Sequence, residues 1–242
     1  MHIAAHAKIN LTLEVLGTRP DGYHDLRSIV AAIPLHDDVE LLDAPPGEVT
    51  AEMTGDGMEV PFVPNEKNLA VRAARALIAA TGAARGVHIR IVKRIPAGAG
   101  LGGGSADAAA VLNGLNDLWD LGLPKERLCD IGATVGSDVP ALVLGGVVLM
   151  EGRGERVKRI DGFELPPFER FVLRVPGVHA STPAVYAEFR EEDCGKGSND
   201  LQPAACRLYP KIAEVVAQME DEGLENVRMS GSGSAVFGWR KE

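Results

Sequence analysis

The chain has 242 residues, of which 45% are hydrophobic, enough for a substantial core in one large domain or two modest ones. Its formal net charge of −9 argues against nucleic acid as a partner, because sequence-independent binding to nucleic acid depends on Lys and Arg. The sequence contains neither a run of about 18 apolar residues nor a secretory leader, so we expect a cytoplasmic protein that does not bind a membrane.

The first predicted element is a strand over residues 8–16, Lys-Ile-Asn-Leu-Thr-Leu-Glu-Val-Leu. Apolar and polar residues alternate along it, which is typical of a strand with one buried face. Lys8 and Asn10 belong to the polar set. On this pattern alone, both side chains face solvent.

Residues 19–24, Arg-Pro-Asp-Gly-Tyr-His, follow this strand. Their proline and glycine favour a tight turn, which exposes Tyr23 and His24. Short strands are predicted next over 39–42 and 49–53. A helix with one apolar face then follows from Asn68 to Thr81, and the glycine after it is a typical helix stop.

The most distinctive stretch covers residues 96–110, Pro-Ala-Gly-Ala-Gly-Leu-Gly-Gly-Gly-Ser-Ala-Asp-Ala-Ala-Ala. An alternating strand over 87–95 precedes it, and an alanine-rich helix is predicted to begin at Ser105. Consecutive glycines let backbone N–H groups approach a ligand, and a helix start adds unpaired donors and about +0.5 charge. A flexible turn is the alternative, but linkers seldom place five glycines in seven residues between a strand and a helix. The stretch therefore predicts a polyphosphate-binding loop.

Three familiar phosphate loops do not fit this stretch. A Walker loop needs Lys and then Ser or Thr after its last glycine, whereas Ser105 and Ala106 follow here. A dinucleotide fingerprint needs an acidic residue about 20 positions on at the end of a second strand, but Asp117 and Asp120 lie on or just after the predicted helix. The downstream motifs of a protein kinase are also missing.

The chain after this helix contains a second segment with two interpretations. A short helix is predicted from Pro124, and it leads into Gly-Ser-Asp-Val-Pro, in which Asp138 is either a helix cap or turn residue or a catalytic group. The apolar run over 141–150 predicts paired strands. We place a domain boundary in the charged connection after it, which gives domains of residues 1–155 and 156–242.

The second half begins with a predicted strand over 171–175. Residues 181–186 read Ser-Thr-Pro-Ala-Val-Tyr, two helical stretches end near Glu222, and residues 229–234 read Met-Ser-Gly-Ser-Gly-Ser. By composition alone, this last stretch is an ordinary turn.

Residues 96–105 resemble the second motif of the GHMP small-molecule kinases, named for galactokinase, homoserine, mevalonate and phosphomevalonate kinases. Lys8-x-Asn10 resembles the first motif of that family, and residues 229–234 resemble the third. The resemblance implies an α+β GHMP kinase fold of two domains with the active site in the cleft between them. It also implies that ATP is the phosphoryl donor, with Mg²⁺ expected. The implied ATP-binding residues are Pro96, Ala97, Gly98, Ala99, Gly100, Leu101, Gly102, Gly103, Gly104, Ser105 and Ala106.

Within this family the chain is most similar to kinases of diphosphocytidyl-methylerythritol, because Asp-Gly-Tyr-His and the segment around Tyr186 resemble their cytosine-binding signatures. The implied reaction phosphorylates the 2-hydroxyl of that substrate in isoprenoid precursor synthesis. Lys8 and Asp138 are implied to be catalytic. The implied substrate-binding residues are Asn10, Tyr23, His24, Thr182 and Tyr186, and the third-motif loop comprises Ser230, Gly231, Ser232 and Gly233. The implied partner is a small molecule with a cytidine diphosphate moiety.

Two alternatives remain open. One is a GHMP kinase that acts on another small alcohol, and the other is an inactive nucleotide-binding homologue.

The family usually continues with a helix and a strand after its third motif, so the resemblance predicts a C-terminal domain that is shortened at its end. Ile29 and Val30 also stand where the family often has an aromatic residue. The sequence assigns neither metal ligands nor an oligomeric state.

Overall fold

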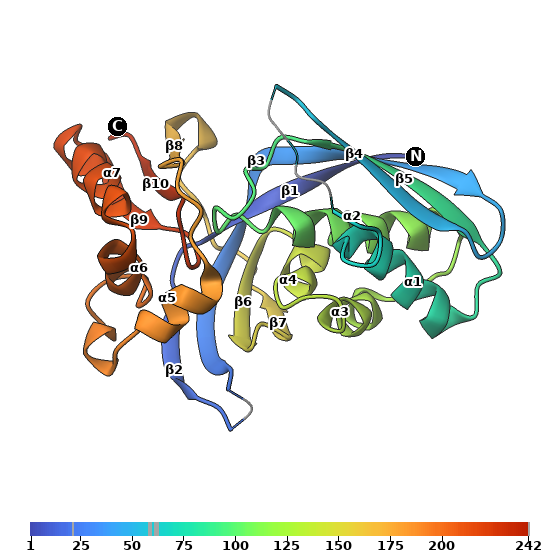
Figure 1. The fold of residues 1–242 in the computed structure, drawn as a ribbon, viewed down its shortest axis with the longest axis horizontal. Helices are drawn as coiled ribbons and strands as arrows, with labels where there is room; N and C mark the ends of the chain where they lie inside the picture. The colour runs from blue at the N-terminus through green and yellow to red at the C-terminus, as the bar shows by residue number, and fades with distance from the viewer. Residues whose placement is uncertain (21, 58–59, 61–62, 242) are drawn as a thin grey trace.

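One long strand, β3 (His24–Ala44), organises the first sheet of the computed structural model, which describes residues 1–20, 22–57, 60 and 63–241 (Figure 1). Along one edge of β3 run β1 (His2–Asn10) and β2 (Glu14–Thr18), and along the other run β5 (Gly86–Lys93) and β6 (Val147–Gly152), all antiparallel to it. The sheet is completed by β4 (Val49–Gly55), parallel to β5, and β7 (Arg156–Arg159), antiparallel to β6. The predicted strands over 39–42 and 49–53 are therefore parts of longer strands.

The strand predicted over 8–16 is interrupted between β1 and β2. The backbone N–H groups of Leu11 and Thr12 both point at the carbonyl oxygen of Ile29, at 2.7 and 3.4 Å, so the regular pairing is lost there. The expectation of a solvated polar face is also wrong at its first two positions, because Lys8 and Asn10 are only 4% and 1% exposed. The third-motif loop of the second half lies over them.

Four helices cover one face of this sheet: α1 (Leu69–Thr81), α2 (Gly103–Leu118), α3 (Lys125–Ala133) and α4 (Val139–Leu144) (Figure 1). The central helix α2 approaches the sheet closely at Gly114, where an added Cβ would lie 2.0 Å from Cδ1 of Ile3. The prediction for α1 is confirmed: the Asn68 side chain accepts a hydrogen bond from Ala70 N, and Gly82 ends the helix with a φ of 69°.

The paired strands predicted over 141–150 are wrong in their first half, which forms α4 and is followed by β6. Pro140 lies in the first turn of α4, where its missing N–H group removes no helical hydrogen bond. Gly145 and Gly146, with φ of 65° and 71°, then separate the helix from the strand. A short apolar run fits a buried helix as well as a strand, so periodicity could not separate the two.

The second half contains an antiparallel sheet in the order β8, β10, β9. Its elements are β8 (Phe171–Arg174), α5 (Thr182–Glu188), α6 (Gln202–Leu208), α7 (Pro210–Asp221), β9 (Glu225–Met229) and β10 (Val236–Trp239), with short 3-10 turns at Phe168–Arg170 and Glu191–Asp193. Figure 1 shows α6 and α7 on the far side of this sheet from the first half.

Buried side chains from each half of the chain pack into the hydrophobic core of the other half. Phe237 and Trp239 of β10 belong to the same hydrophobic cluster as the core under the first sheet, while Leu13 and Val15 belong to the cluster under α6 and α7. The boundary predicted between residues 155 and 156 falls within the β6–β7 hairpin, so the first sheet continues to Arg159.

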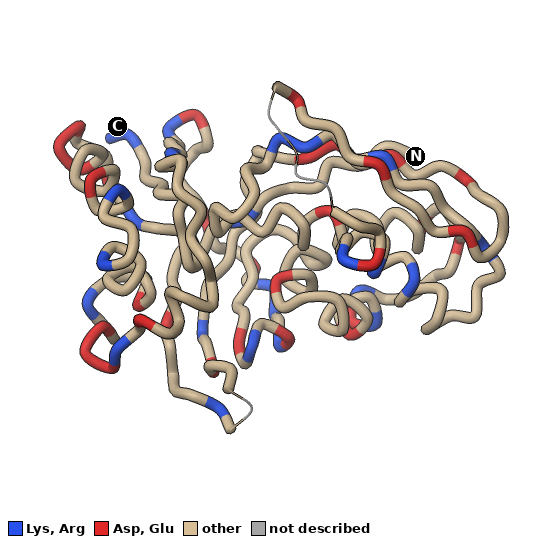
Figure 2. The backbone as a smooth tube through the Cα atoms, viewed as in Figure 1, with Lys and Arg blue, Asp and Glu red and all other residues tan. Residues whose placement is uncertain are grey.

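Acidic and basic residues both occur along the neighbouring strands β3, β4 and β5 (Figure 2). Arg90 Nε lies 2.6 Å from Glu52 Oε1, and Arg94 contacts Asp38 and Asp56 at 2.7 Å each. The side chains of these pairs are each a third or more exposed, so water and salt screen the attraction and the pairs add little to stability. Of the helices in the described ranges, none is long and apolar enough to cross a bilayer.

Candidate active site

A cavity of about 970 Å³ lies between the two halves, near the upper end of the usual size of ligand pockets. The glycine loop, the end of β1, the turn before β3, the start of α4 and the first turns of α5 all contribute to its lining. The structure therefore gathers at one cavity the segments that resemble the family motifs.

The glycine loop has the geometry of an anion site. Gly98, Gly100 and Gly102 have φ of 65°, 74° and 70°, a conformation in which other residues are strained. α2 begins at Gly103, two residues before the predicted start, and no side chain caps it, so its first N–H groups point toward the cavity end of the helix. Residues 96–105 line the cavity, whereas Ala106 is buried in the core and does not.

Ser230 joins all three motifs. Its hydroxyl donates to the carbonyl oxygen of Gly100 at 2.9 Å and accepts from Asn10 N at 3.2 Å. A Cβ at Gly100 would lie 2.2 Å from Ser230 O, so only glycine allows this approach. Gly231 and Ser232 line the cavity, and Ser230 and Gly233 lie behind it. The third motif thus supports the glycine loop.

Asn199 fixes the third-motif loop from the other side, a role that sequence reasoning missed. Its buried side-chain amide donates to the carbonyl oxygens of Met229 and Gly231 at 2.9 and 2.8 Å. A polar residue just before a helix is a common turn residue, so the sequence around Asn199 does not indicate this contact with the third-motif loop.

Lys8 and Asp138 come together in the lining of the cavity. Lys8 Nζ donates to Asn10 Oδ1 at 2.6 Å and lies 3.6 Å from Asp138 Oδ2. Asp138 occupies the cap position of α4, yet its side chain makes no capping hydrogen bond. The carboxylate faces Lys8 instead, which argues against the helix-cap interpretation. Its 31% exposure leaves it accessible from the cavity.

The residues predicted to bind cytosine lie at one end of the cavity. The rings of His24 and Tyr186 stack with centroids 4.9 Å apart and an angle of 28°. Tyr23 is 56% exposed, and the Arg153 guanidinium lies 5.1 Å from the centre of its ring. Burial raises the pKa of Tyr186, as does the nearby negative charge of Asp138. Asp21 of the same signature lies outside the described residues.

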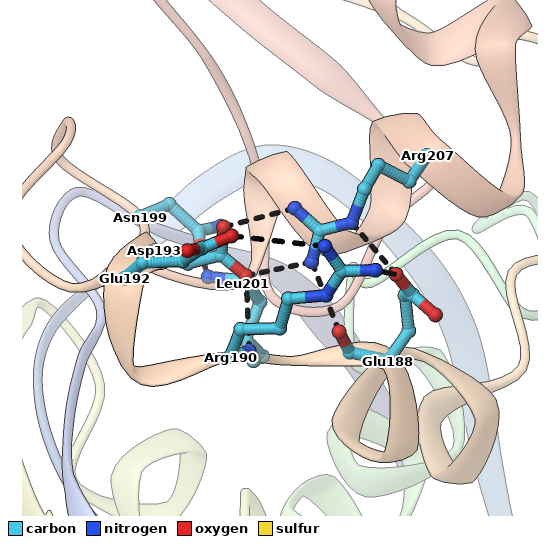
Figure 3. A network of polar contacts seen from close by, with 7 residues as sticks. All are labelled: Glu188, Arg190, Glu192, Asp193, Asn199, Leu201 and Arg207. Carbon is cyan, nitrogen blue, oxygen red and sulfur yellow. Dashed lines mark hydrogen bonds and ion pairs between the residues drawn. The ribbon is translucent and has the colours of Figure 1, made fainter.

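Thr182, the remaining predicted substrate residue, lies at the start of α5 and its hydroxyl is 2.7 Å from that of Ser232. α5 is itself anchored by a network of ion pairs (Figure 3). Arg207 of α6 contacts both carboxylate oxygens of the buried Asp193, at 2.9 and 2.7 Å, and Glu188 Oε1 at 2.7 Å. The network therefore fixes α5, and with it Tyr186, relative to α6.

Sequence reasoning also missed a buried charge cluster beside the glycine loop. Lys93 Nζ donates to Asp37 Oδ2 and to Asp107 Oδ2, the latter at 2.6 Å. Asp37 also accepts from two backbone N–H groups, but Asp107 Oδ1 has no hydrogen-bond partner within the described structure. Burial raises the pKa of Asp107 to about 7 despite the attraction of Lys93. Burial acts to lower the pKa of Lys93, but the two carboxylates hold it above its usual range.

Comparison with known proteins assigns the family. Residues 68–146 match the description "GHMP kinases N terminal domain", and residues 183–242 match "GHMP kinases C terminal". The chain belongs to the GHMP kinase family. It is therefore a small-molecule kinase, and the predicted α+β fold is confirmed.

The chain resembles members of this family over nearly its whole length. It is 42% identical to a 4-diphosphocytidyl-2-C-methyl-D-erythritol kinase of Geobacter sp. (strain M21), over 98% of this chain and 89% of the relative. A kinase of the same name from Pelotomaculum thermopropionicum is 40% identical, over 97% and 87%. A crystal structure of a 4-(cytidine 5'-diphospho)-2C-methyl-D-erythritol kinase superposes with a TM-score of 0.81 at 37% identity, covering 100% of this chain and 90% of that one. The Methanococcus jannaschii mevalonate kinase, at 14% identity and a TM-score of 0.69, shares the fold and covers 100% of this chain and 90% of its own.

Proposed function

We propose that this GHMP kinase transfers the terminal phosphoryl group of ATP to the 2-hydroxyl of 4-diphosphocytidyl-2-C-methyl-D-erythritol. The observation that carries the proposal is the position of the Lys8–Asp138 pair, in one cavity with the glycine loop and with the stacked rings of His24 and Tyr186. The names of the relatives support the choice of substrate. Isoprenoid precursor synthesis is the pathway that this reaction serves.

In the proposed mechanism, Asp138 accepts the proton of the substrate hydroxyl as the oxygen attacks the terminal phosphorus of ATP, and ADP leaves. The Lys8 ammonium stabilises the negative charge that develops on the attacking oxygen. Asn10 holds the ammonium in place through the 2.6 Å hydrogen bond. Phosphoryl transfer depends mainly on positioning and on charge stabilisation, and the N–H groups of the glycine loop would bind the ATP phosphates.

Mg²⁺ is expected with the ATP phosphates and would neutralise their charge there. In nucleotide sites this ion is held by one or two carboxylates together with phosphate oxygens. The described residues contain no group of three or more His, Cys, Asp or Glu side chains that could hold a metal ion.

The cytosine end of the cavity gives a prediction for Tyr186. The proposed sandwich of the base between Tyr23 and Tyr186 requires both rings, and stacking of a base on an aromatic ring contributes about 1–3 kcal/mol. Tyr186→Ala should therefore raise KM for the cytidyl substrate about 5- to 150-fold and leave KM for ATP unchanged. Tyr186→Phe keeps the ring and serves as the matched control. An unchanged KM in Tyr186→Ala would show that the base does not stack there.

A coupled assay of ADP release tests the proposed function. The cytidyl substrate, mevalonate and homoserine are compared as acceptors at saturating ATP and Mg²⁺. We expect ADP release with the cytidyl substrate alone. Faster release with another alcohol would favour a different GHMP kinase, and no release with any acceptor would favour an inactive homologue.

A further inference from the structure

Arg153 lies at the tip of the β6–β7 hairpin, at the edge of the cavity. On one side of it, Gly152 pairs with Leu26, two residues after His24 in β3. On the other side, Gly154 packs against Ser137, the neighbour of Asp138: a Cβ at Gly154 would lie 2.6 Å from Ser137 O. The hairpin tip therefore lies between the aromatic end of the cavity and the catalytic pair.

The chemistry of the proposed substrate requires phosphate-binding groups in that interval. In a diphosphocytidyl alcohol, the diphosphate connects the cytidine to the alcohol that is phosphorylated. With the base between Tyr23 and Tyr186 and the hydroxyl at Asp138, the diphosphate must lie between these two positions. Its negative charges need cationic or N–H partners there, because charge-assisted contacts are the strong ones in phosphate recognition.

Four Lys or Arg residues line the cavity within the described ranges: Lys8, Lys67, Lys93 and Arg153. Lys8 contacts Asn10 and Asp138, and Lys93 is held between two aspartates. Lys67 precedes α1 beside Leu69, whose Cδ1 would lie 3.4 Å from a Cβ at Gly104 of the glycine loop. Arg153 alone of this set adjoins the cytosine-binding end.

The Arg153 guanidinium is available for such a contact. It lies over the Tyr23 ring at 5.1 Å, a cation–π arrangement that leaves the edges of the guanidinium open to oxygen ligands. No ion pair joins it to a carboxylate of the described residues. The two acidic neighbours in the hairpin are engaged elsewhere: Glu155 accepts from the backbone N–H of Arg153 at 2.6 Å, and Glu151 faces Arg27 at 3.4 Å.

We propose that Arg153 binds the diphosphate of the cytidyl substrate while its guanidinium holds the Tyr23 ring in place for the base. This inference rests on the proposed function. Arg153 is then a substrate-binding residue that distinguishes a nucleoside diphosphate derivative from an uncharged cytidine. A planar, permanently charged guanidinium suits this role, because it can contact two phosphate oxygens at once.

The test compares Arg153→Gln with the wild type for binding of two probes, CDP and cytidine. Both dissociation constants are measured by NMR titration with the ATP site saturated by a non-hydrolysable ATP analogue, so that CDP cannot bind there. We expect Arg153→Gln to weaken CDP about 10- to 100-fold and cytidine less than 3-fold, on the usual strength of a hydrogen bond to a charged group. Arg153→Lys, which keeps the charge but not the planar fork, should lie between. Arg156→Gln in β7, an exposed residue outside the cavity lining, is the matched control.

The outcomes separate the inference from the function on which it rests. Equal weakening of CDP and cytidine would show that Arg153 acts only through Tyr23, and unchanged CDP binding would show that it contacts no phosphate. Either result overturns the inference. If the wild type binds neither probe and releases no ADP with the cytidyl substrate, the proposed function itself fails.

Discussion

Asp138→Asn is expected to lower kcat about 10²- to 10⁴-fold, the usual contribution of a general base. The substitution keeps the shape of the side chain and removes its basicity, so the substrate hydroxyl loses its proton acceptor. The 3.6 Å approach to Lys8 Nζ and the absence of a capping bond show that the side chain is positioned by the cavity and not by α4. Dissociation constants for ATP and the cytidyl substrate should change by less than about 5-fold, since the contact matters most in the transition state.

Single-turnover kinetics measure this effect directly, because product release does not contribute to them. Asp130→Asn is the matched control: Asp130 is on α3, its side chain is 72% exposed, and it faces Arg127 at the surface. A single-turnover rate of Asp138→Asn equal to that of the wild type would remove Asp138 as the base. Loss of ATP binding in the same variant would instead indicate that its charge supports the nucleotide site.

The parts of the site that could be predicted from the sequence are those encoded in short segments. The glycine loop is an example, because its backbone conformation depends on which residues lack a Cβ, and Gly98, Gly100 and Gly102 all adopt positive φ. Residues 96–105 line the cavity as expected. The cap and stop of α1 are local signals in the same sense.

The burial of Lys8 could not be read from β1 itself. Its strand pattern places it on a polar face, and only the packing of Gly231 against it, from more than two hundred residues later in the chain, removes it from water. The resemblance places Lys8 and Asn10 at the active site, and both line the cavity. Asn199 and Arg153 were missed for a related reason, since their partners come from other segments.

The Lys93 cluster shows the same limit most clearly. Asp37 comes from the interior of β3, Lys93 from the end of β5 and Asp107 from the first turns of α2. None of these residues has a neighbour in sequence that suggests a buried ion pair. The cluster forms only through tertiary packing, which places two carboxylates against one ammonium beside the glycine loop.

This cluster gives a second large expected effect, on stability. The pKa of Asp107 is raised by burial from 3.8 to about 7 in the folded protein. Between these two values the folded state binds a proton that the unfolded state has released, so the free energy of unfolding falls as pH rises. Below pH 3.8 the carboxyl is protonated in both states and costs nothing, and above about pH 7 the full cost is present.

Asp107→Asn removes this titration while Lys93 keeps its contact with Asp37. The unfolding free energy of the variant should therefore rise relative to wild type across the window from pH 3.8 to about 7. The raised pKa of Asp107 corresponds to a change of about 4 kcal/mol at most in this free-energy difference, because each unit of pKa corresponds to about 1.4 kcal/mol. Urea unfolding of both proteins at a series of pH values measures this difference in unfolding free energy. Groups that titrate alike in both proteins cancel from it.

Asp117→Asn is the matched control, because Asp117 lies on the same helix but is exposed. NMR titration of the Asp107 carboxyl carbon gives an independent measure, with a midpoint expected near pH 7. A flat difference between Asp107→Asn and wild type from pH 4 to 7, together with a carboxyl midpoint below pH 4, would contradict the prediction. Lys93 would then compensate the charge of both aspartates fully, and the unpartnered Oδ1 of Asp107 would carry its negative charge at no cost to the fold.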